Sequence, residues 1–250
     1  MINLKTPSEI EAMRPAGRLS AKVLRKVGEL VQPGISTWEL DCFAESMIRL
    51  EGGHPAFLGY NGFPASICSS INDQIVHGIP SQQVILQAGD IVSIDVGVII
   101  DGWVGDNAAT FAVGAISAEK QRLLEVTEAS MWAGISQALA TGHLEDIGHA
   151  VQQVAEAAGF GVVHEYVGHG IGRQMHEKPN VPNFGRRGRG IKLQAGMVLA
   201  IEPMINIGSG DTKGPFADGW VVYTADGLPS AHFEKTVAIT ADGPLVLTEE

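Results

Sequence analysis

The sequence predicts an α+β domain built from two similar halves, residues 1–114 and 115–250, in which helices cover a curved antiparallel sheet. Three observations support this fold class. Each half opens with two amphipathic helical segments, each then reaches an HGI tripeptide, and each continues with a strand introduced by LQAG and a later DGW turn. Because the signals keep the same order, we expect one domain spanning residues 1–250, with its halves related by a pseudo-twofold axis. A chance likeness between two amphipathic strands is the alternative.

The first half is expected to begin with a helix over residues 6–31. Thr6 and Glu9 have the spacing of a capping box, and Pro7 occupies the first helical position. A second helix should follow the PGIS turn and end at the glycine pair 52–53, because glycine commonly terminates helices.

The second half repeats this arrangement. A helix is expected from Ser117 to about Ala140, and after the TGHLEDIG turn another should run to about Ala158, just before Gly159. The strand LQAGMVLAIE at 193–202 then matches LQAGDIVSID at 86–95, and both end in an acid.

Composition excludes several classes of function. The formal net charge of −11 argues against a nucleic-acid-binding surface as the main activity. No apolar run approaches the roughly 18 residues that a membrane helix needs. The start MINLKTPSEIEAM lacks a signal-peptide pattern, and Cys42 and Cys68 do not make a disulfide framework. We therefore expect a cytoplasmic protein, with a secreted protein lacking disulfides as the alternative.

Four carboxylates occupy repeated positions in the two halves. A hairpin turning around residues 100–102 should place Asp95 and Asp106 directly opposite each other, and Glu202 and Glu234 form the corresponding pair of the second half. An exposed acid at a strand end would explain any one of them. Four acids in two buried pairs require nearby positive charge. We therefore expect cations, and more than one divalent ion, at a shared site.

Lys235 does not supply that charge in this interpretation, because alternation along a strand should direct it to the face opposite Glu234. The glycine-rich segment VGHGIGRQMHE adds His169 and His176 to the candidates. Neutral imidazole binds divalent metals well, so a histidine near an acid cluster is a candidate ligand. A structural histidine is the alternative for each.

Five segments of the sequence together resemble the type I methionine aminopeptidases of peptidase family M24, in their short bacterial form. These segments are CSSINDQIVHGIP, SIDVGVIIDGWVGDNAATF, GHGIGRQMHE, GMVLAIEPMI and FEKT. The resemblance spans essentially the whole chain and implies the duplicated pita-bread fold. It implies a metal-dependent hydrolase that removes the N-terminal methionine from nascent polypeptides whose second residue is small.

The resemblance also implies roles for individual residues. Two divalent ions, of cobalt, manganese, iron or zinc, would be bound by Asp95, Asp106, His169, Glu202 and Glu234. His77 would contact the substrate amide, and His176 the carbonyl of the bond to be cleaved. The methionine side chain would bind among Phe57, Tyr60, Phe63, Cys68, Met175 and Trp220. Relatives often carry other residues in place of Phe57 and Met175, and FEKT replaces the more usual FEHT, which affects local charge beside Glu234.

The expected mechanism is attack of a metal-bridged hydroxide on the first peptide carbonyl, with Glu202 carrying the proton to the leaving amine and His176 stabilising the oxyanion. The alternatives are another pita-bread peptidase, such as an X-Pro aminopeptidase, or a non-catalytic binding relative. We expect a monomer with no membrane association. The basic run GRRGRG at 185–190 is expected to be a solvated loop, with a transient ribosome contact as the alternative.

Overall fold

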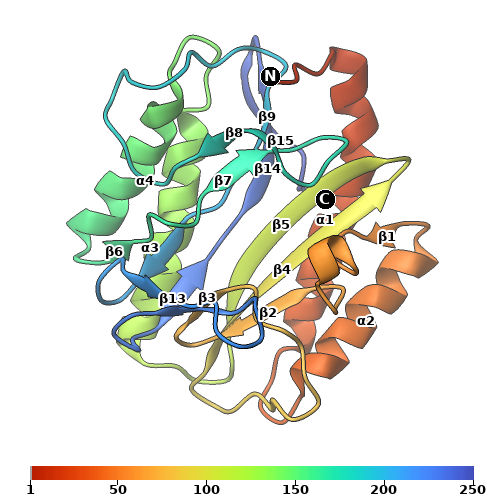
Figure 1. Cartoon of the computed structure of the whole chain (residues 1–250), viewed down its shortest axis with the longest axis vertical. Helices are drawn as coiled ribbons and strands as arrows, with labels where there is room; N and C mark the ends of the chain where they lie inside the picture. The colour runs from red at the N-terminus through yellow and green to blue at the C-terminus, as the bar shows by residue number, and fades with distance from the viewer. Residues whose placement is uncertain (1) are drawn as a thin grey trace.

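The first half of the chain packs two helices against a long antiparallel hairpin. In the computed structural model, which describes residues 2–250, helices α1 (Pro7–Leu30) and α2 (Thr37–Leu50) cover strands β4 (Ile91–Ile100) and β5 (Trp103–Ala112). Met1, the first residue of the predicted first half, lies outside the described residues. Figure 1 shows this helix pair on one side of the strands and the second helix pair on the other.

The helix starts follow the local signals in the sequence. The Thr6 hydroxyl accepts a hydrogen bond from Glu9 N–H, and the Glu9 carboxylate accepts one from Thr6 N–H, which completes the predicted capping box. Ser36 and Glu39 form the same arrangement at the start of α2. Each box satisfies backbone donors that a helix start would otherwise leave unpaired. The predictions of both helices are confirmed.

The second half places helices α3 (Ala118–Ser136) and α4 (Leu144–Ala157) over its own strands. A five-stranded antiparallel sheet runs in the order β15 (Gly243–Val246), β14 (Lys235–Thr240), β9 (Val198–Ile201), β7 (Gly168–Gly170) and β8 (Glu177–Val181). Fully buried Leu123, Ile147 and Leu199 belong to the core between these helices and strands.

Short strands complete three further sheets. Strands β1 (His54–Pro55) and β2 (Cys68–Ile71) both pair with the edge of β4 that β5 leaves free, β1 near Ile99 and β2 near Ile94. A second sheet runs β13 (Ser230–His232), β10 (Met204–Asn206), β6 (Gly161–Val162), and a third runs β11 (Thr212–Lys213), β12 (Val222–Thr224), β3 (Gln74–Val76). A 3₁₀ turn, η1, spans Tyr60–Gly62. The fold is therefore α+β with antiparallel sheets, as predicted.

One prediction about the β4–β5 hairpin is wrong. Ile100 pairs with Trp103, so the turn is the two-residue loop Asp101–Gly102, with φ angles of 50° and 73°. Two consecutive left-handed residues suit a tight hairpin, and Asp-Gly is a favoured sequence for it. Asp95 therefore faces Ala108, and Asp106 faces Gly97. The two acids share one face of the hairpin, but they are diagonal neighbours and not a directly opposed pair.

Over residues 2–250, none of the helices combines the length and the hydropathy that crossing a bilayer would require. The division into halves at residue 114 stays a prediction; residues 113–117 form the connection between β5 and α3.

Candidate metal centre

Five strands or strand ends bring the predicted metal ligands together. Asp95 lies on β4, Asp106 on β5 and His169 on β7, while Glu202 directly follows β9 and Glu234 directly precedes β14. All five side chains line a single cavity. Residues from both halves of the chain thus meet between the two helix pairs (Figure 1).

Glu202 and Glu234 lie opposite each other in the gap between two antiparallel pairings, that of β9 with β14 and that of β10 with β13. Ile201 pairs with Lys235 on one side of the gap, and Met204 pairs with His232 on the other, in the same antiparallel register. Phe233 N–H also donates to Pro203 O at 3.4 Å between the two ladders. The two glutamates therefore occupy opposed positions, as the sequence predicted for the second pair of acids.

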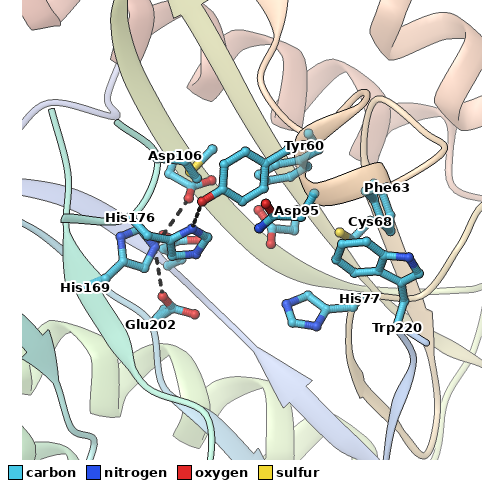
Figure 2. A pocket seen from close by; sticks show the side chains of 14 residues that line it. Tyr60, Phe63, Cys68, His77, Asp95, Asp106, His169, His176, Glu202 and Trp220 are labelled. Carbon is cyan, nitrogen blue, oxygen red and sulfur yellow. Dashed lines mark hydrogen bonds and ion pairs between the residues drawn. The ribbon is translucent and has the colours of Figure 1, made fainter. Parts of the chain in front are cut away.

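His169 directs one ring nitrogen at two of the carboxylates. Its Nδ1 lies 2.9 Å from Gly170 O, and because a carbonyl only accepts, the proton is on Nδ1. Nε2 then carries a lone pair, yet it lies 3.4 Å from Glu202 Oε1 and 3.8 Å from Asp106 Oδ2 (Figure 2). Three electron-rich atoms facing one another in this way suit a cation among them.

Burial dominates the electrostatics of the four acids. It raises the pKa of Asp106 to about 7, and it raises the pKa of Asp95, Glu202 and Glu234 well above the ordinary carboxyl value. The charge of Asp106 adds to the shift in these three. Burial also lowers the pKa of His169 to about 4, so its ring is neutral at pH 7. Four ionised carboxylates would therefore be unfavourable in this buried site unless cations bind among them.

The residues present fit a bound metal. Asp95 Oδ1, Asp106 Oδ1 and Glu234 Oε1 are buried without a hydrogen-bond partner. Among the lysine, arginine and histidine side chains of residues 2–250, only those of histidines place a nitrogen within 4.0 Å of the four carboxylates. Asp106, His169 and Glu234 each offer one ligand atom, and these three atoms lie within 4.8 Å of one another. The same is true of Glu202, His232 and Glu234. Buried oxygens without donors are what a divalent ion would satisfy.

An apolar wall closes the other end of the cavity, whose volume is about 250 Å³. The ring of Trp220 packs edge-on against Phe63, with centroids 5.1 Å apart. Cys68 lies on the same side, and Figure 2 shows its sulfur near Trp220. Cys68 pairs directly with Asp95 across β2 and β4. Burial raises the pKa of the Cys68 thiol well above its usual range, so the side chain is an uncharged part of this wall.

All thirteen residues predicted for the site line this one cavity. They are Phe57, Tyr60, Phe63, Cys68, His77, Asp95, Asp106, His169, Met175, His176, Glu202, Trp220 and Glu234.

Two further histidines lie beside the cluster. The ring of His176 lies 4.3 Å from that of His169, and its Nδ1 lies 2.8 Å from the Tyr60 hydroxyl (Figure 2). His77 has an unusual positive φ of 61° and packs edge-on against Trp220. Burial lowers the pKa of both His176 and His77, which favours the neutral ring that can donate or accept a proton.

Two residues at the site were missed from the sequence. Asn61 lines the cavity from the η1 turn. His232 has no partner pattern in the sequence, but it is buried and its Nε2 lies 3.5 Å from Glu202 Oε2. Burial lowers its pKa to about 3. The available signal was its position two residues before Glu234, which places both on one face of an extended chain.

The chain belongs to metallopeptidase family M24, whose family model matches residues 11–241. Its relatives within that family include methionine aminopeptidases from Clostridium perfringens, 53% identical, and Bacillus subtilis, 49% identical. Each alignment covers 99% of this chain and 99% of the relative. The crystal structure of methionine aminopeptidase from Rickettsia prowazekii superposes with a TM-score of 0.98 at 43% identity, covering 100% of both chains.

Prolidase from Pyrococcus furiosus shares the fold more distantly, with a TM-score of 0.78 and 22% identity over 99% of this chain and 65% of its own. These likenesses confirm the predicted pita-bread fold and the predicted family.

Proposed function

We propose that this protein is a metal-dependent aminopeptidase that hydrolyses the first peptide bond of polypeptides beginning with methionine. The observation that carries the proposal is the cavity itself. At one end lie buried carboxylates and a histidine with unsatisfied ligand atoms, and at the other a wall of Phe57, Phe63, Met175 and Trp220. A methionine side chain would fill the apolar end while its amine and first carbonyl reach the polar end.

Two divalent ions are proposed for the polar end, bound by Asp95, Asp106, His169, Glu202 and Glu234. Four carboxylates exceed the charge of one divalent ion, which supports a pair with shared ligands. An oxygen-rich set with one imidazole suits manganese, iron, cobalt or zinc. When bound, such ions lower the pKa of water toward neutrality and polarise a carbonyl.

The chain's own residues would then position the substrate and move protons. Glu202, which lines the polar end of the cavity beside His169, is proposed to carry the proton to the leaving amine, because its carboxylate lies where the first peptide bond would bind. His176 is proposed to donate a hydrogen bond to the carbonyl oxygen as negative charge develops there. For that, Nε2 must carry the proton, and Tyr60 O–H donating to Nδ1 would favour that tautomer. His77, on the Trp220 side, is proposed to contact the substrate amide.

The proposed partners are the N-termini of nascent polypeptides whose second residue is small. We propose a monomer that acts in the cytoplasm, where such chains are made; two unpaired cysteines, Cys42 and Cys68, are compatible with that reducing environment. In the basic loop, Gly188 N–H donates to Asp146 and Arg186 N–H to Glu145, so acidic side chains of α4 hold it. That arrangement supports a solvated loop over a ribosome contact.

Three peptides test this function: Met-Ala-Ser, Met-Ile-Ser and Ala-Pro-Ala, each incubated with metal-loaded protein before and after chelation. Release of methionine from the first peptide alone, abolished by chelation and restored by added metal, is expected. Cleavage of Ala-Pro-Ala alone would favour an X-Pro aminopeptidase instead. Absence of cleavage from all three, at full metal occupancy, would favour a binding protein.

A further inference from the structure

The loop that carries His176 is attached to the N-terminal segment by a buried ion pair. Lys5 Nζ lies 2.7 Å from Glu177 Oε2, and the two side chains are only 6% and 5% exposed. Glu177 is the residue directly after His176 and begins β8, whereas Lys5 precedes α1. The contact joins residues 172 positions apart in the chain.

Glu177 organises the backbone of that loop, residues 171–176. Its Oε1 accepts hydrogen bonds from Arg173 N–H at 2.9 Å and from Gln174 N–H at 3.3 Å. Its Oε2 accepts from Lys5 and, at 3.2 Å, from Asn3 Nδ2. Burial by itself would raise the pKa of Glu177, but the bond from Lys5, followed by that from Gln174 N–H, outweighs it and leaves the pKa lowered. The carboxylate is thus charged and saturated with donors.

The ion pair packs closely against the loop backbone. A Cβ on Gly172 would lie 2.5 Å from Lys5 Cε and 2.7 Å from Glu177 Oε1, so a larger residue there would displace the ion pair. Lys5 is fixed in turn, because its N–H donates to Gly196 O at 2.7 Å. The Lys5 ammonium therefore has a defined place against the loop.

We propose that Lys5 and Glu177 are positioning residues, which hold the loop 171–176 so that His176 and Met175 reach the cavity. Both act through the loop backbone, since neither Lys5 nor Glu177 lines the cavity. The inference deepens the proposed function and depends on it for the role of His176. A neutral methionine in place of Lys5 would leave Glu177 buried without its cation, and the loop would lose its fixed conformation.

The test compares Lys5→Met with Lys22→Met, a matched control. Lys22, on α1, pairs at 2.8 Å with Glu51, the residue after α2, but these side chains are 39% and 46% exposed, and exposed pairs contribute little. The first measurement is hydrogen exchange of the Arg173 and Gln174 amides in metal-free protein. Faster exchange is expected in Lys5→Met and wild-type exchange in Lys22→Met.

The second measurement is steady-state methionine release. A loop displacement should lower kcat by about 10- to 100-fold with a much smaller change in KM, because His176 would act on the developing charge. Lys5→Arg, which keeps the cation, should recover much of the rate. If Lys5→Met fails to fold, Glu177→Gln removes the charge while keeping an oxygen for the two amides, and should change exchange and kcat in the same direction.

The positioning role would be overturned if Lys5→Met showed wild-type exchange and wild-type kcat. If Lys5→Met does not fold, the same result in Glu177→Gln would overturn it. A wild-type protein that releases no methionine would overturn the proposed function instead. The exchange comparison would still decide whether Lys5 holds the loop.

Discussion

Lys235 Nζ lies 3.0 Å from Asn107 Oδ1, which ties the residue after Glu234 to the residue after Asp106. Lys235 also donates to Thr248 O at 3.3 Å, and the neighbouring Thr236 hydroxyl donates to Asp106 O at 2.8 Å. The lysine is therefore on the face away from the cavity, as strand alternation predicts. It supports the strands from which two of the proposed ligands project.

Lys235→Met should weaken metal binding. The variant loses both hydrogen bonds behind Glu234 and Asp106, and loss of such supporting contacts commonly costs 10- to 100-fold in metal affinity. Anaerobic titration calorimetry with Mn²⁺ measures the effect. Lys213→Met, at an exposed lysine of β11, is the control and should bind the ion as the wild type does. Unchanged affinity in Lys235→Met would contradict a supporting role.

His176→Ala should depress kcat by about 100- to 1000-fold while leaving metal content unchanged, because one preorganised donor to an oxyanion is worth that much. Tyr60→Phe removes only the hydroxyl at 2.8 Å from His176 Nδ1 and should have a smaller effect in the same direction. Metal analysis and kinetics on the same samples provide the measurement. Loss of metal with a normal rate per bound ion would show that the role of His176 is misassigned.

His232→Leu should lower kcat by about 10-fold or more. The His232 ring nitrogen is the buried neighbour of Glu202 Oε2 at 3.5 Å, and without it the glutamate loses a polar contact that orients it. His232→Gln restores a polar group and should retain more activity than the leucine variant. Equal rates for wild type and His232→Leu, at equal metal occupancy, would refute this.

Metal-free protein should lose stability as the pH rises from about 6.5 through the folded pKa of Asp106, about 7, and beyond. Unfolded carboxyls lose their protons near pH 4, whereas folded Asp106 keeps its proton to about 7, and Asp95, Glu202 and Glu234 keep theirs higher. Above about pH 6.5 the folded state thus binds more protons than the unfolded state, which gives a negative slope of stability against pH. The lowered pKa values of the site histidines act with the opposite sign, but only below about 6.5.

Thermal unfolding of chelated protein across this range measures the slope through Tm. Saturating metal should flatten it, because the bound cation favours the ionised carboxylates at every pH in the range. Glu234→Gln should reduce the slope in the metal-free protein by removing one of the four acids. A Tm that stays constant or rises in chelated wild type would rule out retained protons in the site.

The sequence by itself determined the features that depend on neighbouring residues. Thr6 with Glu9 defines where α1 begins. The repeated LQAG segments predict β4, in which Asp95 lies, and β9, which ends just before Glu202. The glycine-rich segment identified His169 and His176 as candidates, and the motif resemblance added the aromatic wall; all of these residues line the cavity.

Only the tertiary structure decided what depends on register and on distant contacts. A one-residue difference in the turn at Asp101–Gly102 moved Asp95 from a position opposite Asp106 to one opposite Ala108. His232 approaches Glu202 because two ladders share one register across an interruption, and Lys5 reaches Glu177 from 172 residues away. Such contacts leave no local periodicity in the chain, because they form only when separate elements pack against one another.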